Sequence, residues 1–367
     1  MDHRRVDAGD LQRFAAALLE TTGADGDTAA TVAESLVAAE LRGHPSHGVQ
    51  LLPDYLEWAE SRHLDPAADP EVVAERGALH VDGNHGFGHR VGREATAAAV
   101  ERVDERVAVT VGIRKATHLG RIGWFAEQAA AAGLGFVGFT NMTSGDPVAP
   151  AGSAQRRFGT NPLTFGLPAF DALDHPVVFD AATSQVAYGK LNVRQMGGGE
   201  GDPAWTVDAD GDPVTDPDRF NETGAGALAP LGGQQAGYKG TGLMLIAELF
   251  AATWSDSPVT PQPDARYENA AAFTVFDPLA FTSRAAHEAR LVALEEYLDE
   301  TEYTASVGAG AGTGADRAYL PGRTEHDTRT AYEREGVPVP VQVCGTLVGL
   351  AKGHGVAGAV IDPVAGE

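Results

Sequence analysis

Residues 88 to 141 alternate between helix-forming and strand-forming segments, and this alternation is the strongest constraint on what the chain can fold into. The helical run GREATAAAVERVDER is followed by the β-branched run VAVTVGI, and the helical GWFAEQAAAAG is then followed by the apolar LGFVGFTN. The pattern predicts an α/β layer, because each helix needs the face of a sheet to cover its apolar side.

Helices are also predicted before and after this stretch of the sequence. DAGDLQRFAAALLETTG and DGDTAATVAESLVAAELRG begin with acidic residues, end at glycine and repeat apolar residues at three- and four-residue steps, as amphipathic helices do. VQLLPDYLEWAES and EARLVALEEYLDE predict two more helices, and GTGLMLIAELFAATW is apolar enough to predict a buried one.

We therefore expect an α/β protein of two domains. Residues 1–76 form a helical domain, which residues 275–367 complete by packing back on it, and residues 77–274 form the α/β domain. A chain of 367 residues is long enough for both domains to have a core.

The charge of the chain limits its partners. It has 51 Asp and Glu against 27 Lys and Arg, a formal net charge of −24, and only four of the basic residues are lysines. A uniformly acidic, lysine-poor surface repels nucleic acid and anionic membranes, and it stays soluble where salt screens self-repulsion within a few ångströms. We interpret the acidity as adaptation to high salt, as in a halophile, and expect no nucleic acid or membrane partner.

The cysteine count and the hydropathy pattern predict a cytoplasmic protein. Cys344 is the single cysteine, which excludes an internal disulfide framework and a four-cysteine zinc site. The start, MDHRRVDAGDLQRF, lacks the apolar run of a signal peptide, and no segment approaches the about 20 apolar residues of a membrane span.

Two polar residues stand at the ends of predicted strands, where α/β proteins commonly bind ligands. His118 comes after the strand that starts at VAVTVGI and lies just before Gly120 and a predicted helix, so it is either a site residue beside a helix N-terminus or a histidine satisfied by a tight turn. Asp180 ends the apolar strand in HPVVFDAATS. A buried carboxylate is costly unless it is paired, so Asp180 either caps the next turn or partners a histidine.

Two further segments suit the binding of an anion. FGTNPLTFG places Thr160 and Asn161 in a turn that Pro162 fixes, and GGQQAGYKGTGL holds Lys239 between glycines near the start of a helix. Glycine-rich backbone together with a lysine is suited to a phosphate or a carboxylate.

Residues 308–317, GAGAGTGADR, satisfy the loose dinucleotide-binding pattern through Gly310, Gly312 and Ala315. That fingerprint requires a firm strand before it and a helix after it, so that the helix N-terminus meets the pyrophosphate. Only the short YTASV precedes it here and Pro321 interrupts the stretch after it, so we interpret the segment as a loop.

The segment RGHPSHGVQLLPDY contains His44 and His47, which could be a metal-binding pair, a proton-handling site or a polar helix end. Histidines three or four apart on a helix can share a face, so a metal-dependent hydrolase or lyase that uses His44, His47, His85 and His89 is an alternative function. No carboxylate stands at the spacing of a known zinc motif, and GNHGFGH is typical of a turn, so we expect no metal.

Six motifs come one after another in a familiar order: LRGHPSHGVQLLPDY, THLGRIGWFAEQAA, FTN with VAPAGS and FGTNPLTFGLPA, FDAATSQVAYGK, GYKGTGLMLIAEL, and YLPGRTEHDTR. In these motifs the chain resembles the type 2 malate/L-lactate dehydrogenases, a family that includes ureidoglycolate, sulfolactate and Δ1-piperideine-2-carboxylate enzymes. The resemblance implies a non-Rossmann NAD(P)-binding α/β domain with a mixed or antiparallel sheet, a discontinuous helical domain and a homodimer.

The resemblance also assigns roles. His118 matches the histidine of the family's HxG motif, which acts as acid/base, and Ser46 and His47 match its SHG site. Asp180 matches the aspartate of DxATS as a third catalytic residue, and Thr160, from GTNP, joins Ser46 as a substrate contact. The expected contacts of the cofactor, NAD or NADP, are Met142, Asp180, Ala181, Ala182, Lys239, Pro321, Gly322 and Arg323.

The chain departs from the family at Leu51, where members typically read SHGVxRLPxY with an arginine that grips the substrate carboxylate. Leucine cannot supply that charge. We hypothesise that Arg121, one residue past HLG, does so, and the alternative is that Arg121 is an exposed first-turn residue. The departure leaves open whether the substrate is of malate type, lactate type or a cyclic imino acid, and a non-catalytic family member is a further alternative.

The expected reaction is reversible hydride transfer between NAD(P)H and the carbonyl carbon of a 2-oxo acid, or its imine equivalent. A histidine can give or take the accompanying proton in both directions, and we assign this role to His118. Asp180 would orient an imidazole, and His47 would bind the substrate oxygen or exchange roles with His118.

Overall fold

The computed structural model describes residues 2–145, 147–196, 199–217, 220, 226–260, 266–303 and 317–366. Its strands are β1 His3–Val6, β2 Glu71–Glu75, β3 Ala78–Asp82, β4 Ala108–Ala116, β5 Gly135–Met142, β6 Leu163–Leu167, β7 Val177–Ala181, β8 Thr206–Val207, β9 Ala227–Leu228, β10 Asn269–Phe276 and β11 Val337–Pro340. Its α-helices are α1 Ala8–Glu20, α2 Gly26–Leu41, α3 Leu52–Glu60, α4 Gly88–Val103, α5 Gly123–Ala131, α6 Tyr188–Met196, α8 Gly233–Ser255, α9 Arg284–Asp299, α10 Arg323–Glu335, α11 Val341–Gly353 and α12 Gly358–Ala365. Three short 3-10 helices are η1 Pro45–His47, η2 Val49–Leu51 and η3 Pro278–Ala280.

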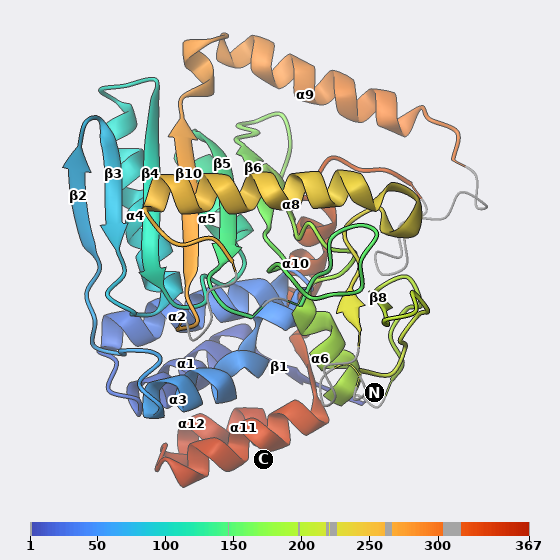
Figure 1. Ribbon diagram of the computed structural model, residues 1–367. Coiled ribbons are helices and arrows are strands. Elements are labelled where there is room, and N and C mark those ends of the chain that lie inside the picture. Colours follow the sequence, from blue (N-terminus) through green and yellow to red (C-terminus); the bar gives the residue numbers. More distant parts are fainter. Residues whose placement is uncertain are drawn as a thin grey trace.

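A mixed seven-stranded sheet in the order β2-β3-β4-β10-β5-β6-β7 forms the centre of the molecule. Strands β3 and β4 pair in parallel, and the other neighbours pair antiparallel. Helices α4 and α5 cover one face and α8 crosses the other (Figure 1). The α/β class and the mixed sheet expected from the sequence are therefore confirmed.

Strand β10 lies between β4 and β5 although it comes more than a hundred residues after them in the chain. It is almost fully buried, because its alanines let helices pack closely on both of its faces. Gly112, in β4, lets α8 approach the sheet closely, because a side chain there would collide with the carbonyl of Trp254.

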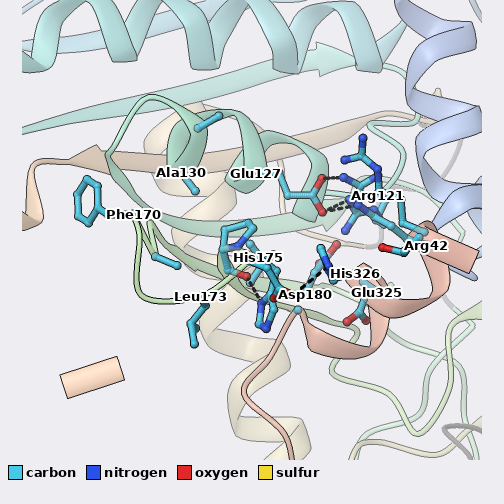
Figure 2. A pocket seen from close by; sticks show the side chains of 18 of the residues that line it. Arg42, Arg121, Glu127, Ala130, Phe170, Leu173, His175, Asp180, Glu325 and His326 are labelled. Carbon is cyan, nitrogen blue, oxygen red and sulfur yellow. Dashed lines mark hydrogen bonds and ion pairs between the residues drawn. The ribbon is translucent and has the colours of Figure 1, made fainter. Parts of the chain in front are cut away.

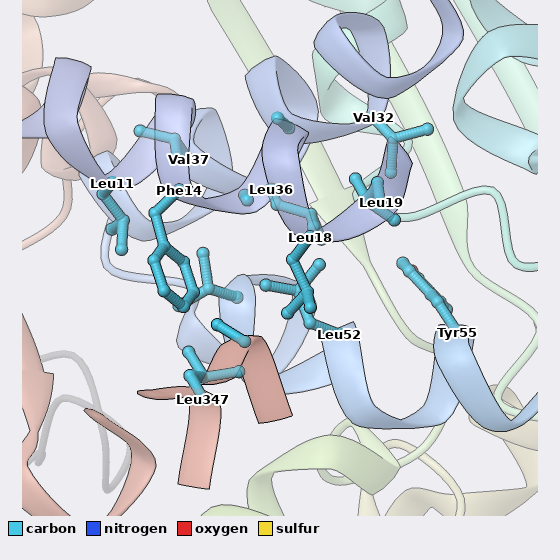
Figure 3. Close-up of a cluster of buried hydrophobic side chains, with 14 of the residues drawn as sticks. Leu11, Phe14, Leu18, Leu19, Val32, Leu36, Val37, Leu52, Tyr55 and Leu347 are labelled. Carbon is cyan, nitrogen blue, oxygen red and sulfur yellow. The ribbon is translucent and has the colours of Figure 1, made fainter. Parts of the chain in front are cut away.

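The second core is helical and is built from both ends of the chain (Figure 3). Side chains of α1, α2 and α3, among them Phe14, Leu18, Leu36 and Leu52, pack with Leu347 of α11. Strand β1 pairs antiparallel with β11, so the first and last segments are held together by backbone hydrogen bonds as well. The carboxylates of Asp7 and Asp25 cap α1 and α2, as the acidic helix starts indicated.

One helix differs from its expected environment. The stretch GTGLMLIAELFAATW lies in α8, where Met244, Ala247 and Ala251 are buried but Leu249 and Phe250 are exposed. The helix packs on one face of the sheet only, so its outer apolar side is uncovered by the described part of the chain. No helix in that part is both long enough and apolar enough to cross a membrane.

The dinucleotide-like pattern with Gly310, Gly312 and Ala315 lies outside the described residues.

Candidate active site

Three histidines and a tyrosine meet where β4 ends against the helical layer. His118 leaves β4 in a turn that continues through Gly120, whose φ of 75° favours glycine. The Tyr55 hydroxyl, from α3, is 2.8 Å from His118 Nδ1 and 3.5 Å from His89 Nε2. The His47 ring stacks on that of His118, with their centroids 5.7 Å apart.

The SHG segment is held rigidly on both sides. Ser46 Oγ lies 3.1 Å from His47 Nδ1, and Gly189 lets α6 pack against Ser46, because a Cβ there would lie 2.9 Å from the Ser46 carbonyl. On the other side the buried Glu40 carboxylate accepts a hydrogen bond of 3.0 Å from Val49 N. Gly48 lies directly on Glu40, so that even a methyl group would collide with the carboxylate.

Burial controls the protonation of this cluster. Burial lowers the pKa of His47 to about 4, although the negative charge of Asp180 acts in the opposite direction. It also lowers the pKa of His89 to about 3. Burial, together with the neighbouring His47 and His89, holds the pKa of His118 well below its usual range. All three imidazoles are therefore neutral near pH 7, the form that can accept a proton.

His47 and His118 open into a cavity of about 410 Å³. It brings together five of the residues singled out from the sequence: Ser46, His47, His118, Met142 and Thr160. Its other described walls include Leu51, Asp54, Trp58, Ile122, Arg156, Tyr188, Tyr267 and Asn269. We refer to it as the small cavity.

A second cavity, of about 820 Å³, lies next to the first between α5, β7 and α10 (Figure 2). The chain passes from one cavity to the other within a few residues: Gly120 and Ile122 line the small cavity and Arg121 lines the large one. In the same way, His47 lines the small cavity and His44 lines the large one. The large cavity is also lined by His175 and Gly322.

Asp180 lines the large cavity, where its carboxylate is held by α5 and the sheet. One oxygen accepts a hydrogen bond of 2.7 Å from Gly123 N at the start of α5, and the other accepts one of 2.8 Å from Thr164 Oγ1. These bonds hold the start of α5, which precedes Asp180 in the chain, rather than the turn after it or an imidazole as the sequence suggested, while the charge of Asp180 still acts on His47.

Arg121 is buried, with 6% of its side chain exposed, and does not line the small cavity. It donates a hydrogen bond of 2.5 Å to Glu127, which also pairs with Arg42 (Figure 2). Two positive charges therefore share one carboxylate. Arg121 Nε and His175 Nε2 are both buried without a hydrogen-bond partner in the described structure, and both residues line the large cavity. The Arg121 Nε–H is an unpaired buried donor, which suits an anionic ligand, whereas His175 Nδ1 donates to the Pro176 carbonyl, so Nε2 of the neutral ring is an acceptor.

The remaining expected cofactor residues are spread more widely. Gly322 caps α10 and lines the large cavity, whereas Arg323 points to Asp327 and Glu295. Lys239 lies on the exposed side of α8 and lines neither cavity.

Three more of the expected cofactor residues stand close to the large cavity without lining it. Ala181 and Ala182 come directly after Asp180 at the end of β7, and the Pro321 carbonyl accepts a hydrogen bond from Val178 N.

The sequence did not indicate Tyr55, Glu40 or His175. One signal was present for Tyr55: it follows Leu51 by four residues, so on a helix the two side chains share the face that meets the site.

The histidines of the metal alternative have separate partners. His44 Nε2 lies 3.3 Å from a Glu325 oxygen and His85 Nδ1 lies 3.0 Å from a Glu268 oxygen, whereas His47 and His89 surround His118. Within the described ranges, no group of three or more His, Cys, Asp or Glu side chains is arranged to hold a metal ion.

Comparison with known proteins agrees with this geometry. The family model described as malate/L-lactate dehydrogenase matches residues 6–348. Hydroxycarboxylate dehydrogenase B of Escherichia coli K12 is 31% identical over 342 residues, which cover 91% of this chain and 90% of that protein. L-lactate dehydrogenase of Cupriavidus necator is 33% identical over 331 residues, with 89% and 91% covered. The structure of a putative malate/lactate dehydrogenase from E. coli superposes with a TM-score of 0.88 at 27% identity, covering 99% of both chains.

The chain belongs to the malate/L-lactate dehydrogenase family, as the six motifs indicated. It is thus an oxidoreductase that acts on small hydroxy or imino acids, and the metal-dependent hydrolase is not favoured.

Proposed function

We propose that this enzyme transfers a hydride reversibly between NAD(P)H and C2 of a small 2-oxo acid or cyclic imino acid, with substrate in the small cavity and cofactor in the large one. The observation that carries the proposal is the pair of neighbouring cavities with the neutral histidines at the small one. In the reducing direction the 2-oxo acid takes up the hydride at C2 and a proton at the oxygen, and becomes the 2-hydroxy acid.

The large cavity fits a nicotinamide dinucleotide. Arg121 Nε is an unpaired donor that would meet one of its phosphates, and Gly322 lets α10 begin close to that wall. When bound, the cofactor supplies or accepts the hydride.

The histidines handle the proton in this proposal. Tyr55 holds His118 at Nδ1 and Ser46 holds His47 at Nδ1, so each ring offers its Nε2 to the substrate. We assign the proton transfer to His118 and a hydrogen bond with the substrate oxygen to His47, with Ser46 and Thr160 as further substrate contacts. Asp180 acts by fixing α5 and by its charge on His47.

The test is a panel of 2-oxo acids and a cyclic imine, each assayed with NADH and NADPH in molar KCl. Loss of the reduced-nicotinamide absorbance with at least one pair supports the proposal. Absence of turnover with every pair, in protein that is folded by circular dichroism, contradicts it and leaves the non-catalytic alternative.

We further propose a cytoplasmic homodimer adapted to high salt. The net charge of −24 supports the salt adaptation, and the apolar outer face of α8 supports self-association. That face consists of Tyr238, Leu243, Leu245, Ile246, Leu249 and Phe250.

Residues 77–274 are proposed to bind the cofactor in a non-Rossmann manner, since the sheet has one parallel pair among its described strands. The division into this domain and a helical one of residues 1–76 and 275–367 also remains a proposal.

A further inference from the structure

The small cavity extends past the histidines along one face of α3. Leu51, Asp54 and Trp58 stand at three- and four-residue steps, so they share the face that also carries Tyr55 to His118. Tyr267 packs against Trp58, with the two ring centroids 5.0 Å apart, and both rings line the cavity. This end of the cavity is therefore mostly aromatic and aliphatic.

The described walls of the small cavity offer little positive charge to an acidic ligand. Of the described residues that line it, Arg156 is the one lysine or arginine. It donates hydrogen bonds to the carbonyls of Phe220 and Gly226 and stacks on the Phe220 ring, with its guanidinium 4.1 Å from the ring centroid. The described residues thus offer the cavity at most one guanidinium for a substrate that brings one carboxylate with its reacting carbon.

Asp54 is the one carboxylate among the same lining residues. It is half-buried, and this burial, together with the smaller effect of the Glu57 charge, raises its pKa. Burial, and then the Asp54 charge, raise the pKa of Tyr267 as well, which puts the carboxylate within electrostatic reach of the aromatic wall. Whether charged or protonated, Asp54 provides no cation.

We propose that the small cavity selects monocarboxylic 2-oxo acids with a bulky apolar or aromatic side chain, placed between Trp58 and Leu51, and rejects acids with a second carboxylate or a sulfonate. This inference rests on the proposed function and names its substrate class. A second anion would lose its hydration against Trp58 and Tyr267 and would face Asp54, whereas an apolar group there is removed from water. The volume of about 410 Å³ has room for a side chain larger than methyl.

The experiment compares kcat/KM for phenylpyruvate, 4-methyl-2-oxopentanoate, pyruvate and oxaloacetate, with both reduced cofactors and the full chain in high salt. We expect at least one of the two bulky acids to exceed oxaloacetate by tenfold or more. Equal or better use of oxaloacetate overturns this inference alone. Absence of turnover of every acid overturns the proposed function and the inference together.

Two substitutions test the cause of the preference. Leu51→Arg adds a cation to the wall and Asp54→Asn removes the carboxylate, so each should raise the ratio of kcat/KM for oxaloacetate to that for 4-methyl-2-oxopentanoate, by at least tenfold for Leu51→Arg and about threefold for Asp54→Asn. Glu60→Gln, on the exposed side of the same helix, is the matched control. If the ratio stays at the control value in every variant that folds, this account of the selectivity is wrong.

Discussion

Replacement of Tyr55 by Phe removes one oxygen atom from the active site and leaves the shape of the side chain intact. That oxygen lies 2.8 Å from His118 Nδ1, a full hydrogen bond, and Tyr55 is 1% exposed, so water cannot easily take its place. A buried partner left unsatisfied costs about 1–3 kcal/mol, and each 1.4 kcal/mol is about a factor of ten in rate. If the bond holds the His118 ring in its working orientation, kcat should fall about tenfold.

The assay is steady-state turnover of the best 2-oxo acid, with cofactor binding measured separately by nicotinamide fluorescence. Tyr297→Phe, on a side chain that is 70% exposed in α9, is the control for loss of a tyrosine hydroxyl. Because Tyr55 acts through His118, the double variant Tyr55→Phe/His118→Gln should be no slower than His118→Gln alone. A Tyr55→Phe enzyme within twofold of the wild type, or a double variant another tenfold slower, would refute the reasoning.

Four other properties of the protein can be tested in the same manner. His118→Gln should lower kcat by roughly 10²–10⁴-fold with little change in cofactor binding, and if His47→Gln has that effect while His118→Gln does not, the two roles are exchanged. Arg121→Ala should weaken NAD(P)H binding at least tenfold, because the unpaired Nε of Arg121 lines the large cavity. If only the KM for the acid rises, Arg121 binds the substrate carboxylate instead. Burial raises the pKa of Glu40 to about 7 in the folded chain, above its usual 4.5, so its ionisation destabilises the fold as pH rises from about 4.5 through 7. Glu40→Gln, which keeps an acceptor for Val49, should therefore raise Tm at pH 8 and have a smaller effect near pH 5, and an equal effect at both values would contradict this linkage. Finally, Tm should climb with KCl, since salt screens the net charge of −24, and a flat response from dilute buffer to molar salt would argue against salt adaptation.

The parts of the fold that are local in sequence could be predicted, and those that depend on distant pairing could not. The caps and periodicity of α1 and α2 lie within single segments, so their bounds were predicted closely. Strand β10 was missed, because NAAAFTVF carries no alternation when both of its faces are buried. The exposed side of α8 could not be foreseen either, since composition shows how apolar a helix is but not how many of its faces are covered.

The candidate site divides in the same way. Ser46, His47 and His118 lie in compact motifs, and they line one cavity as the resemblance implied. The partner of His118, Tyr55, is 63 positions away, and nothing in the sequence joins the two.

Two other differences at the site come from partners that the sequence did not indicate. Asp180 accepts a hydrogen bond from Gly123 N of α5, 57 positions away, rather than from an imidazole, and Arg121 donates to the carboxylate of Glu127, six positions further along the chain. Electrostatic partners chosen in three dimensions decided which way both side chains point.

The central position of β10 sets the order in which the molecule can be completed. During synthesis β4 and β5 are made more than a hundred residues before the strand that separates them, so until then β4 can pair only with β3 and β5 only with β6, and the edge of each that faces β10 stays unpaired. The helical layer is completed even later, because β1, at the start of the chain, pairs with β11 near its end. A nascent chain that stops before residue 269 therefore lacks the middle of its sheet, and β4, which leads into His118, can be paired along one edge only.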